Sequence, residues 1–158
     1  MVRILSLRQE RNLYARHLKP FLMGYADIPV ANLVAVKVLD GLGRGTASSL
    51  ISAMGWVQTN AVAPAVLSMS LGSARTSLAL NAAVQDTVAL GFPVIAAAGN
   101  SDTDAVFSPA SEPSAITVGA IDIEDKRAPF SNYGRYVARI SSGSGSDRTS
   151  TKTTKSNG

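Results

Sequence analysis

The sequence contains no cysteine and a single histidine, and these two shortages exclude several kinds of chemistry. Without cysteine there are no disulfides, no zinc sites held by thiolates and no cysteine nucleophile. One histidine excludes a metal site built from several histidines, but it leaves a single catalytic histidine open. No apolar run approaches the roughly 18–20 residues that are needed to span a bilayer.

Hydrophobic residues make up 46% of the 158 residues, which is enough for one domain with a buried core. The net charge of +4 is unevenly distributed. Residues 1–24 and 135–158 each hold five basic residues and one acidic residue, whereas residues 25–134 hold five basic and nine acidic ones. The basic residues are dispersed and form no aromatic-studded motif, so neither nucleic acid nor a membrane is predicted as a partner.

Apolar runs and helical periodicities alternate from residue 31 onward. Apolar, β-branched runs predict strands at residues 32–39, 65–71, 92–98, 115–121 and 136–140. Continuous runs of this kind are typical of strands buried on both faces. Helical spacing predicts one helix from Thr46 or Ser48 to about Asn60, and a second from Thr76 or Ser77 to Gly91. The alternation predicts an α/β fold with a doubly wound, mainly parallel sheet.

The two ends differ from this pattern. Residues 1–30 are interpreted as a basic arm, weakly helical or disordered over residues 1–24, because Pro20 interrupts the leucine spacing there. Arginines break the first apolar stretch too often for a signal-peptide core. Residues 31–140 form the folded part, and residues 141–158, with 13 Ser, Thr or Gly among 18, form a flexible tail.

Three small or glycine-rich segments follow predicted strands, and ligands of such sheets bind outside the carboxyl ends of the strands. These segments are Gly41–Thr46, Ser70–Ala74 and Gly99–Asp104. A nucleotide is one candidate for the first segment. The spacing there is Gly-x-Gly-x-Gly, and no Asp or Glu lies between Asp40 and Asp86 to hold a ribose, so a tight turn explains the glycines better.

Five segments in order resemble subtilisin-like serine proteases (subtilases, peptidase family S8), nearest to the proteinase K branch. The resemblance covers about residues 31–137. The matching segments are Val34-Ala-Val-Lys-Val-Leu-Asp-Gly-Leu-Gly-Arg-Gly45, Met69-Ser-Leu-Gly72, Val94-Ile-Ala-Ala-Ala-Gly-Asn100, Ser108-Pro-Ala-Ser-Glu-Pro-Ser-Ala-Ile-Thr-Val-Gly-Ala120 and Phe130-Ser-Asn-Tyr-Gly134. The resemblance implies a subtilisin-like fold, cut short at both ends, and a monomer that binds extended peptide or protein substrates.

The resemblance also implies residue roles. Asn100 would donate its side-chain amide to the tetrahedral oxyanion. The residues that would line the substrate strand and the pocket before the scissile bond are Gly43, Arg44, Gly45, Ser70, Leu71, Gly72, Ala97, Ala98 and Gly99. Small residues suit this arrangement because main-chain hydrogen bonds supply the affinity. The bond between Ser108 and Pro109 falls where the family tends to carry a cis proline.

The family's catalytic Asp, His and Ser motifs are not found. No Asp-Thr/Ser-Gly or His-Gly-Thr-His precedes residue 31, and His17 stands in an unrelated Arg-His-Leu-Lys context. The residues Ser156-Asn-Gly158 could instead match the approach to the nucleophile loop. We therefore expect an incomplete endopeptidase domain that is inactive alone, or alternatively a non-catalytic module that binds extended peptides.

No cofactor is expected. A structural calcium is implied by the family, but Ala138 stands where the family has a ligating Asp, which leaves only the carbonyls of Pro113 and Ala115. The family is secreted, and the missing signal peptide leaves the compartment of this chain open.

Overall fold

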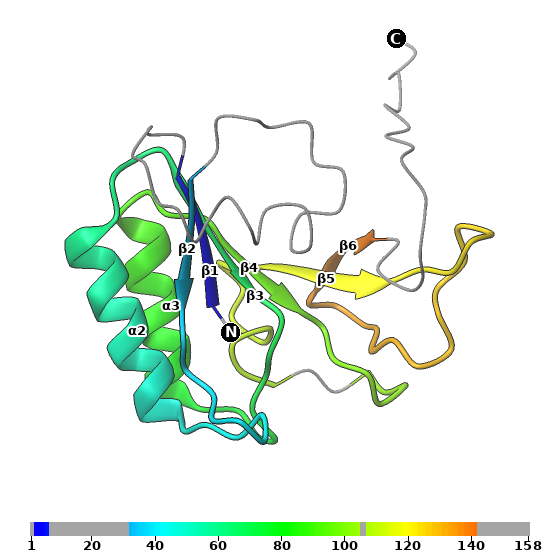
Figure 1. Ribbon diagram of the computed structural model, residues 1–158. Helices are drawn as coiled ribbons and strands as arrows, with labels where there is room; N and C mark the ends of the chain where they lie inside the picture. The colour runs from blue at the N-terminus through cyan, green and yellow to red at the C-terminus, as the bar shows by residue number, and fades with distance from the viewer. Residues whose placement is uncertain (1, 7–31, 105–106, 142–158) are drawn as a thin grey trace, which may run out of the picture.

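The computed structural model describes residues 2–6, 32–104 and 107–141, in which two helices pack against a six-stranded sheet (Figure 1). The strands lie in the order β2-β1-β3-β4-β5-β6. The strands are β1 (Val2–Ser6), β2 (Asn32–Val36), β3 (Ala65–Met69), β4 (Val94–Ala97), β5 (Ile116–Ala120) and β6 (Val137–Ser141), and the helices are α2 (Ala47–Asn60) and α3 (Leu78–Ala89).

The sheet is mainly parallel. Strands β3 to β6 pair in parallel, whereas β1 is antiparallel to both of its neighbours, β2 and β3. Strands β2 and β3 therefore point the same way, and α2 crosses from one to the other as α3 crosses from β3 to β4. Both helices lie on the same side of the sheet (Figure 1). The predicted α/β fold is confirmed, and the carboxyl ends of β2, β3 and β4 share one edge.

The prediction of a weak helix or disordered arm at the start of the chain is wrong for Val2–Ser6. These residues form β1 inside the sheet, where Ile4 lies opposite Val34 on one side and Leu67 on the other. The five residues carry little local signal for a strand, and what decides their structure is pairing with two distant strands. The remainder of the predicted arm, His17 included, and the tail beyond Ser141 lie outside the described residues.

Each helix begins at a hydroxyl that the sequence predicted. The Thr46 side chain accepts a hydrogen bond from the backbone N–H of Ser49, and the Ser77 side chain accepts one from that of Leu80. These bonds satisfy amides that have no partner within the helix. Gly91 follows the end of α3 with φ +88°, the left-handed conformation expected after a helix. The connections around the shared edge therefore have defined geometry.

The core lies between the helices and one face of the sheet. Its most deeply buried side chains include Met54 and Val57 of α2, Leu80 and Val84 of α3, Leu67 and Met69 of β3, and Val94 of β4. The opposite face of the sheet is less covered. Ala35 of β2 and Ala97 of β4 are exposed, so these strands are not buried on both faces. Among the described residues, neither helix is long and apolar enough to cross a membrane.

Candidate active site

A pocket of about 410 Å³ lies at the carboxyl ends of β3 and β4. It brings together seven of the ten residues predicted for substrate and oxyanion: Ser70, Leu71, Gly72, Ala97, Ala98, Gly99 and Asn100. Five further residues complete it. Ser73, Ala74 and Ser101 belong to the ligand segments predicted from the sequence, whereas Phe107 and Asn132 lie outside them. The predicted Gly43, Arg44 and Gly45 do not line this pocket.

The first wall, Ser70–Ala74, follows directly after β3 and is held in place by Ser108. The Ser108 carbonyl accepts hydrogen bonds from the Ser73 backbone N–H at 2.8 Å and from the Ser73 hydroxyl at 3.0 Å. The fully buried Ser108 hydroxyl accepts a bond from the Ser77 N–H and donates to Asn81 Oδ1 at 2.6 Å. The expected cis peptide between Ser108 and Pro109 is present. Ser108 thus fixes both this wall and the start of α3.

The second wall, Ala97–Ser101, continues from the end of β4. The Ala98 N–H donates to the Val118 carbonyl at 2.9 Å, which holds the segment beside β5. The chain then turns at Gly99 with φ +108°, a conformation that residues with a Cβ rarely adopt. Asn100 follows on this turn as an exposed residue of the pocket lining, so its side-chain amide is available to a ligand.

The turn after β2 is organised around Asp40. One Asp40 carboxylate oxygen accepts hydrogen bonds from the N–H groups of Leu42 at 2.9 Å and Arg44 at 2.8 Å. Gly43 lies between them with φ +76°, as a tight turn requires. The carboxylate occupies backbone donors that would otherwise cradle a phosphate, and its charge would repel one. The turn geometry therefore argues against the nucleotide alternative.

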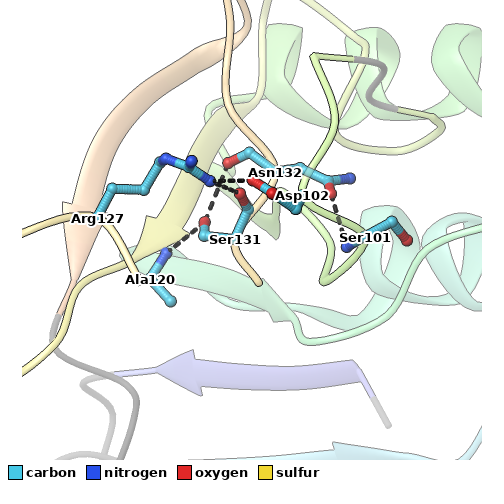
Figure 2. Close-up of polar contacts among 6 residues, drawn as sticks. All are labelled: Ser101, Asp102, Ala120, Arg127, Ser131 and Asn132. Carbon is cyan, nitrogen blue, oxygen red and sulfur yellow. Dashed lines mark hydrogen bonds and ion pairs between the residues drawn. The ribbon is translucent and has the colours of Figure 1, made fainter. Parts of the chain in front are cut away.

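Asn132 is the residue of this pocket that sequence reasoning missed as a functional candidate. In the sequence it stands within the segment Phe130-Ser-Asn-Tyr-Gly134, where nothing marks it as a separate candidate. In the structure its side chain is 4% exposed and bonds to the second wall of the pocket (Figure 2). The position of the motif in the chain gave no sign of this contact, because the partners lie 31 and 34 residues away.

The residues present do not fit the calcium site that the family implies. Calcium takes six to eight oxygen ligands, most strongly carboxylates. Ala138, which is exposed in β6, offers a methyl group where a carboxylate would be needed. Within the described residues, no cluster of three or more Asp, Glu, His or Cys side chains could hold a metal ion. The carbonyls of Pro113 and Ala115 alone do not make a site.

Comparison with known proteins decides the family. The model of the Subtilase family, peptidase S8, matches residues 22–156. The chain belongs to the subtilase family. The match is wider at both ends than the range of residues 31–137 predicted from the motifs.

Individual subtilases agree with this assignment. The chain is 51% identical over 115 residues to "Subtilisin-like protease 2" of Pseudogymnoascus destructans, an alignment covering 72% of this chain and 28% of that protein. It is 44% identical over 132 residues to "Extracellular serine proteinase" of a Thermus species, covering 82% of this chain and 32% of that protein. This subtilase thus spans about a third or less of the length of these relatives.

A solved structure supports the fold of this subtilase. The crystal structure of a cold adapted subtilisin-like serine proteinase superposes with a TM-score of 0.64 at 45% sequence identity. The superposition covers 66% of this chain and 38% of that one. The subtilisin-like fold and the resemblance to subtilisin-like serine proteases are therefore confirmed for the central part of the chain.

Proposed function

We propose that these 158 residues supply the substrate-binding part of a serine endopeptidase domain, and that by themselves they bind extended peptides without cleaving them. The proposal rests on one observation. The segments Ser70–Ala74 and Ala97–Ser101 form two walls of the same pocket, and Asn100 is part of its lining. Two backbone segments that border one cavity suit an extended peptide, whose main chain can bond to them.

The pocket favours an apolar side chain next to a polar carbonyl site. Ala97 and Ala98 present only methyl groups, and Phe107 adds an aromatic surface to the lining. Asn100 brings a side-chain amide whose N–H groups can donate to a carbonyl oxygen or to a developing oxyanion. A peptide would therefore be bound by one apolar residue and oriented by the carbonyl that follows it.

The absence of recognisable triad motifs from this sequence supports binding without cleavage. A serine hydroxyl is a weak nucleophile unless an adjacent base takes its proton, and that base needs a third group to orient it. The described residues include no histidine, and His17 stands in no subtilase motif. Oxyanion stabilisation by Asn100 would lower a barrier only for an attack that these residues do not supply.

A non-catalytic peptide-binding module is the second candidate, and the same missing motifs favour it. The two candidates differ in whether the gene encodes the catalytic motifs outside these 158 residues, which sequencing of the flanking DNA shows. If the gene encodes Asp, His and Ser motifs outside these 158 residues, the endopeptidase assignment holds. If the flanking sequence encodes none, peptide capture is the whole activity.

Substitution of Gly72 tests the binding site with little disturbance of the fold. A Cβ at Gly72 would meet only the Ser108 carbonyl oxygen, at an ordinary distance of 3.8 Å. Gly72→Val should therefore fold, but its branched side chain would stand in the pocket. We expect isothermal titration with an extended apolar peptide to show at least about tenfold weaker binding than the parent chain, or about 1.4 kcal/mol.

Gly55→Ala is the matched control, because Gly55 lies in α2 with no atom within 4 Å of an added Cβ. It should bind as the parent chain does. Equal affinity of Gly72→Val and the parent chain would place the peptide elsewhere and refute the proposed site.

A further inference from the structure

The loop that carries Asn100 is bonded on both sides of that residue to Asn132. The Asn132 N–H donates to the Gly99 carbonyl at 3.0 Å. Its side-chain Nδ2 donates to the Ala98 carbonyl at 3.0 Å, and its Oδ1 accepts from the Ser101 N–H at 2.8 Å. One residue thus holds the backbone before and after Asn100. Because both polar atoms of the Asn132 side chain are engaged with this loop, it is placed to act through the loop.

Gly99 and Asn132 are matched to each other. A Cβ built on Gly99 would lie 2.5 Å from Asn132 Nδ2, a distance that real Cβ atoms essentially never show. The amide of Asn132 can therefore reach the Ala98 carbonyl only because residue 99 has no side chain. Position 99 therefore requires glycine for two separate reasons, the positive φ of its backbone and the close contact with Asn132.

Ser131, the residue before Asn132, is bonded to two further segments of the chain (Figure 2). The neighbouring Ser131, 1% exposed, accepts a bond from the Ala120 N–H through its hydroxyl at 2.9 Å. Arg127 Nη1 donates to the Ser131 carbonyl at 2.6 Å and to Asp102 Oδ1 at 2.7 Å. The arginine therefore joins the segment of Asn132 to the loop of Asn100 a second time.

We propose that Asn132 is a positioning residue that aims the Asn100 amide into the pocket through the backbone of Ala98, Gly99 and Ser101. The inference rests on the proposed function, in which Asn100 donates to a peptide carbonyl oxygen. The bonds to Ala98, Gly99 and Ser101 fix the backbone that carries Asn100, and hence the region that its short side-chain amide can reach. An oxyanion donor works only when its direction is fixed in advance, and Asn132 supplies that fixation.

The test uses two peptides that differ only at the carboxyl terminus. Acetyl-Ala-Ala-Ala-Phe with a free carboxylate presents an anionic oxygen to Asn100, and the same peptide as the primary amide presents a neutral one. The carboxylate should bind about tenfold more tightly to the parent chain, because a hydrogen bond to a charged acceptor is the stronger one. Asn100→Ala should abolish this preference while the amide peptide still binds.

Asn132→Ala should abolish the same preference with little change in affinity for the amide peptide. If Asn132 only stabilised the fold, Asn132→Ala would weaken the binding of both peptides alike. Gly99→Ala should also abolish the preference for the carboxylate, because its Cβ displaces the Asn132 amide. The double variant should lose no more of this preference than either single variant. Gln58→Ala, which removes a hydrogen bond to Thr87 Oγ1 between the two helices, is the control for a general loss of stability.

A second measurement stands apart from peptide binding. Hydrogen exchange of the Ser101 amide should accelerate at least about tenfold in Asn132→Ala, because that amide loses its acceptor. It should not change in Gln58→Ala beyond the global effect on stability.

An unchanged Ser101 exchange rate in Asn132→Ala, or an intact preference for the carboxylate peptide, would overturn the positioning role. A different result would overturn the proposed function alone. In that case the parent chain would bind neither peptide, while Ser101 exchange would still accelerate in Asn132→Ala and so confirm that Asn132 holds the loop.

Discussion

At the scale of single residues, the pocket depends on two buried polar residues, Ser108 and Asn132, that bond to its two walls. Ser108 holds the wall after β3, and Asn132 holds the wall after β4. The Ser108 carbonyl accepts from Ser73 of its wall and the Ser108 hydroxyl accepts from the Ser77 N–H at the start of α3. The Asn132 side chain pairs with the Ala98 carbonyl and the Ser101 N–H. Buried groups of this kind are costly to leave without a partner, so the loss of either side chain should be measurable.

Ser108→Ala is expected to lower the free energy of unfolding by about 1–3 kcal/mol. The substitution leaves the Ser77 N–H and Asn81 Oδ1 without the buried hydroxyl that they share. Urea denaturation measures the change. Ser52→Ala, an exposed serine of α2, is the matched control and should shift stability by less than about 0.5 kcal/mol. A Ser108→Ala variant as stable as this control would show that the network contributes nothing.

At the scale of elements, the strand β1 is what makes the sheet continuous. It pairs with β2 along one edge and with β3 along the other, over all five residues from Val2 to Ser6. Without it, two parallel strands joined by α2 would face each other across a gap of one strand. The stability of the sheet therefore depends on a short segment near the beginning of the chain.

Ile4→Pro is expected to destabilise the protein by about 3 kcal/mol or more, because proline removes a backbone donor inside a sheet. Ile4 lies opposite both Val34 and Leu67, so the change reaches two neighbouring strands. Ile4→Val keeps the backbone donor and should lose much less. Thermal denaturation followed by circular dichroism separates the two variants. If Ile4→Pro melted at the same temperature as the parent chain, the assignment of β1 to the sheet would be wrong.

The elements from residue 32 onward could be predicted because each has a local signal. Thr46 and Ser77 mark the helix starts, and apolar runs mark the strands at 65–71 and 92–98. Strand β1 and the role of Asn132 could not be predicted, since both are decided by partners distant in sequence. The strand pattern alone places Asn100 in a segment at a ligand-binding edge, but its oxyanion role follows only from the resemblance, because an isolated Asn after a strand is ordinarily a loop residue.

At the scale of the whole molecule, one face of the sheet carries both described helices and the other is less covered (Figure 1). Ala35 of β2 is exposed between the half-buried Val34 and Val36, and Ala97 is exposed beside the buried Ala96 of β4. The family match extends over residues 22–156, yet the chain spans about a third or less of its relatives. A domain with a partly uncovered sheet can present a substrate pocket and still lack the groups that would cut the substrate.

As proposed above, these 158 residues hold a peptide without cleaving it. The most direct measurement is equilibrium dialysis of acetyl-Ala-Ala-Ala-Phe-Ala-Ala against the chain, followed by mass spectrometry of the peptide. We expect the protein to retain the peptide, the Gly72→Val variant to retain less of it, and the peptide to be recovered intact. Recovery of the peptide cut after Phe, with cutting blocked by a serine-protease reagent, would contradict the proposal.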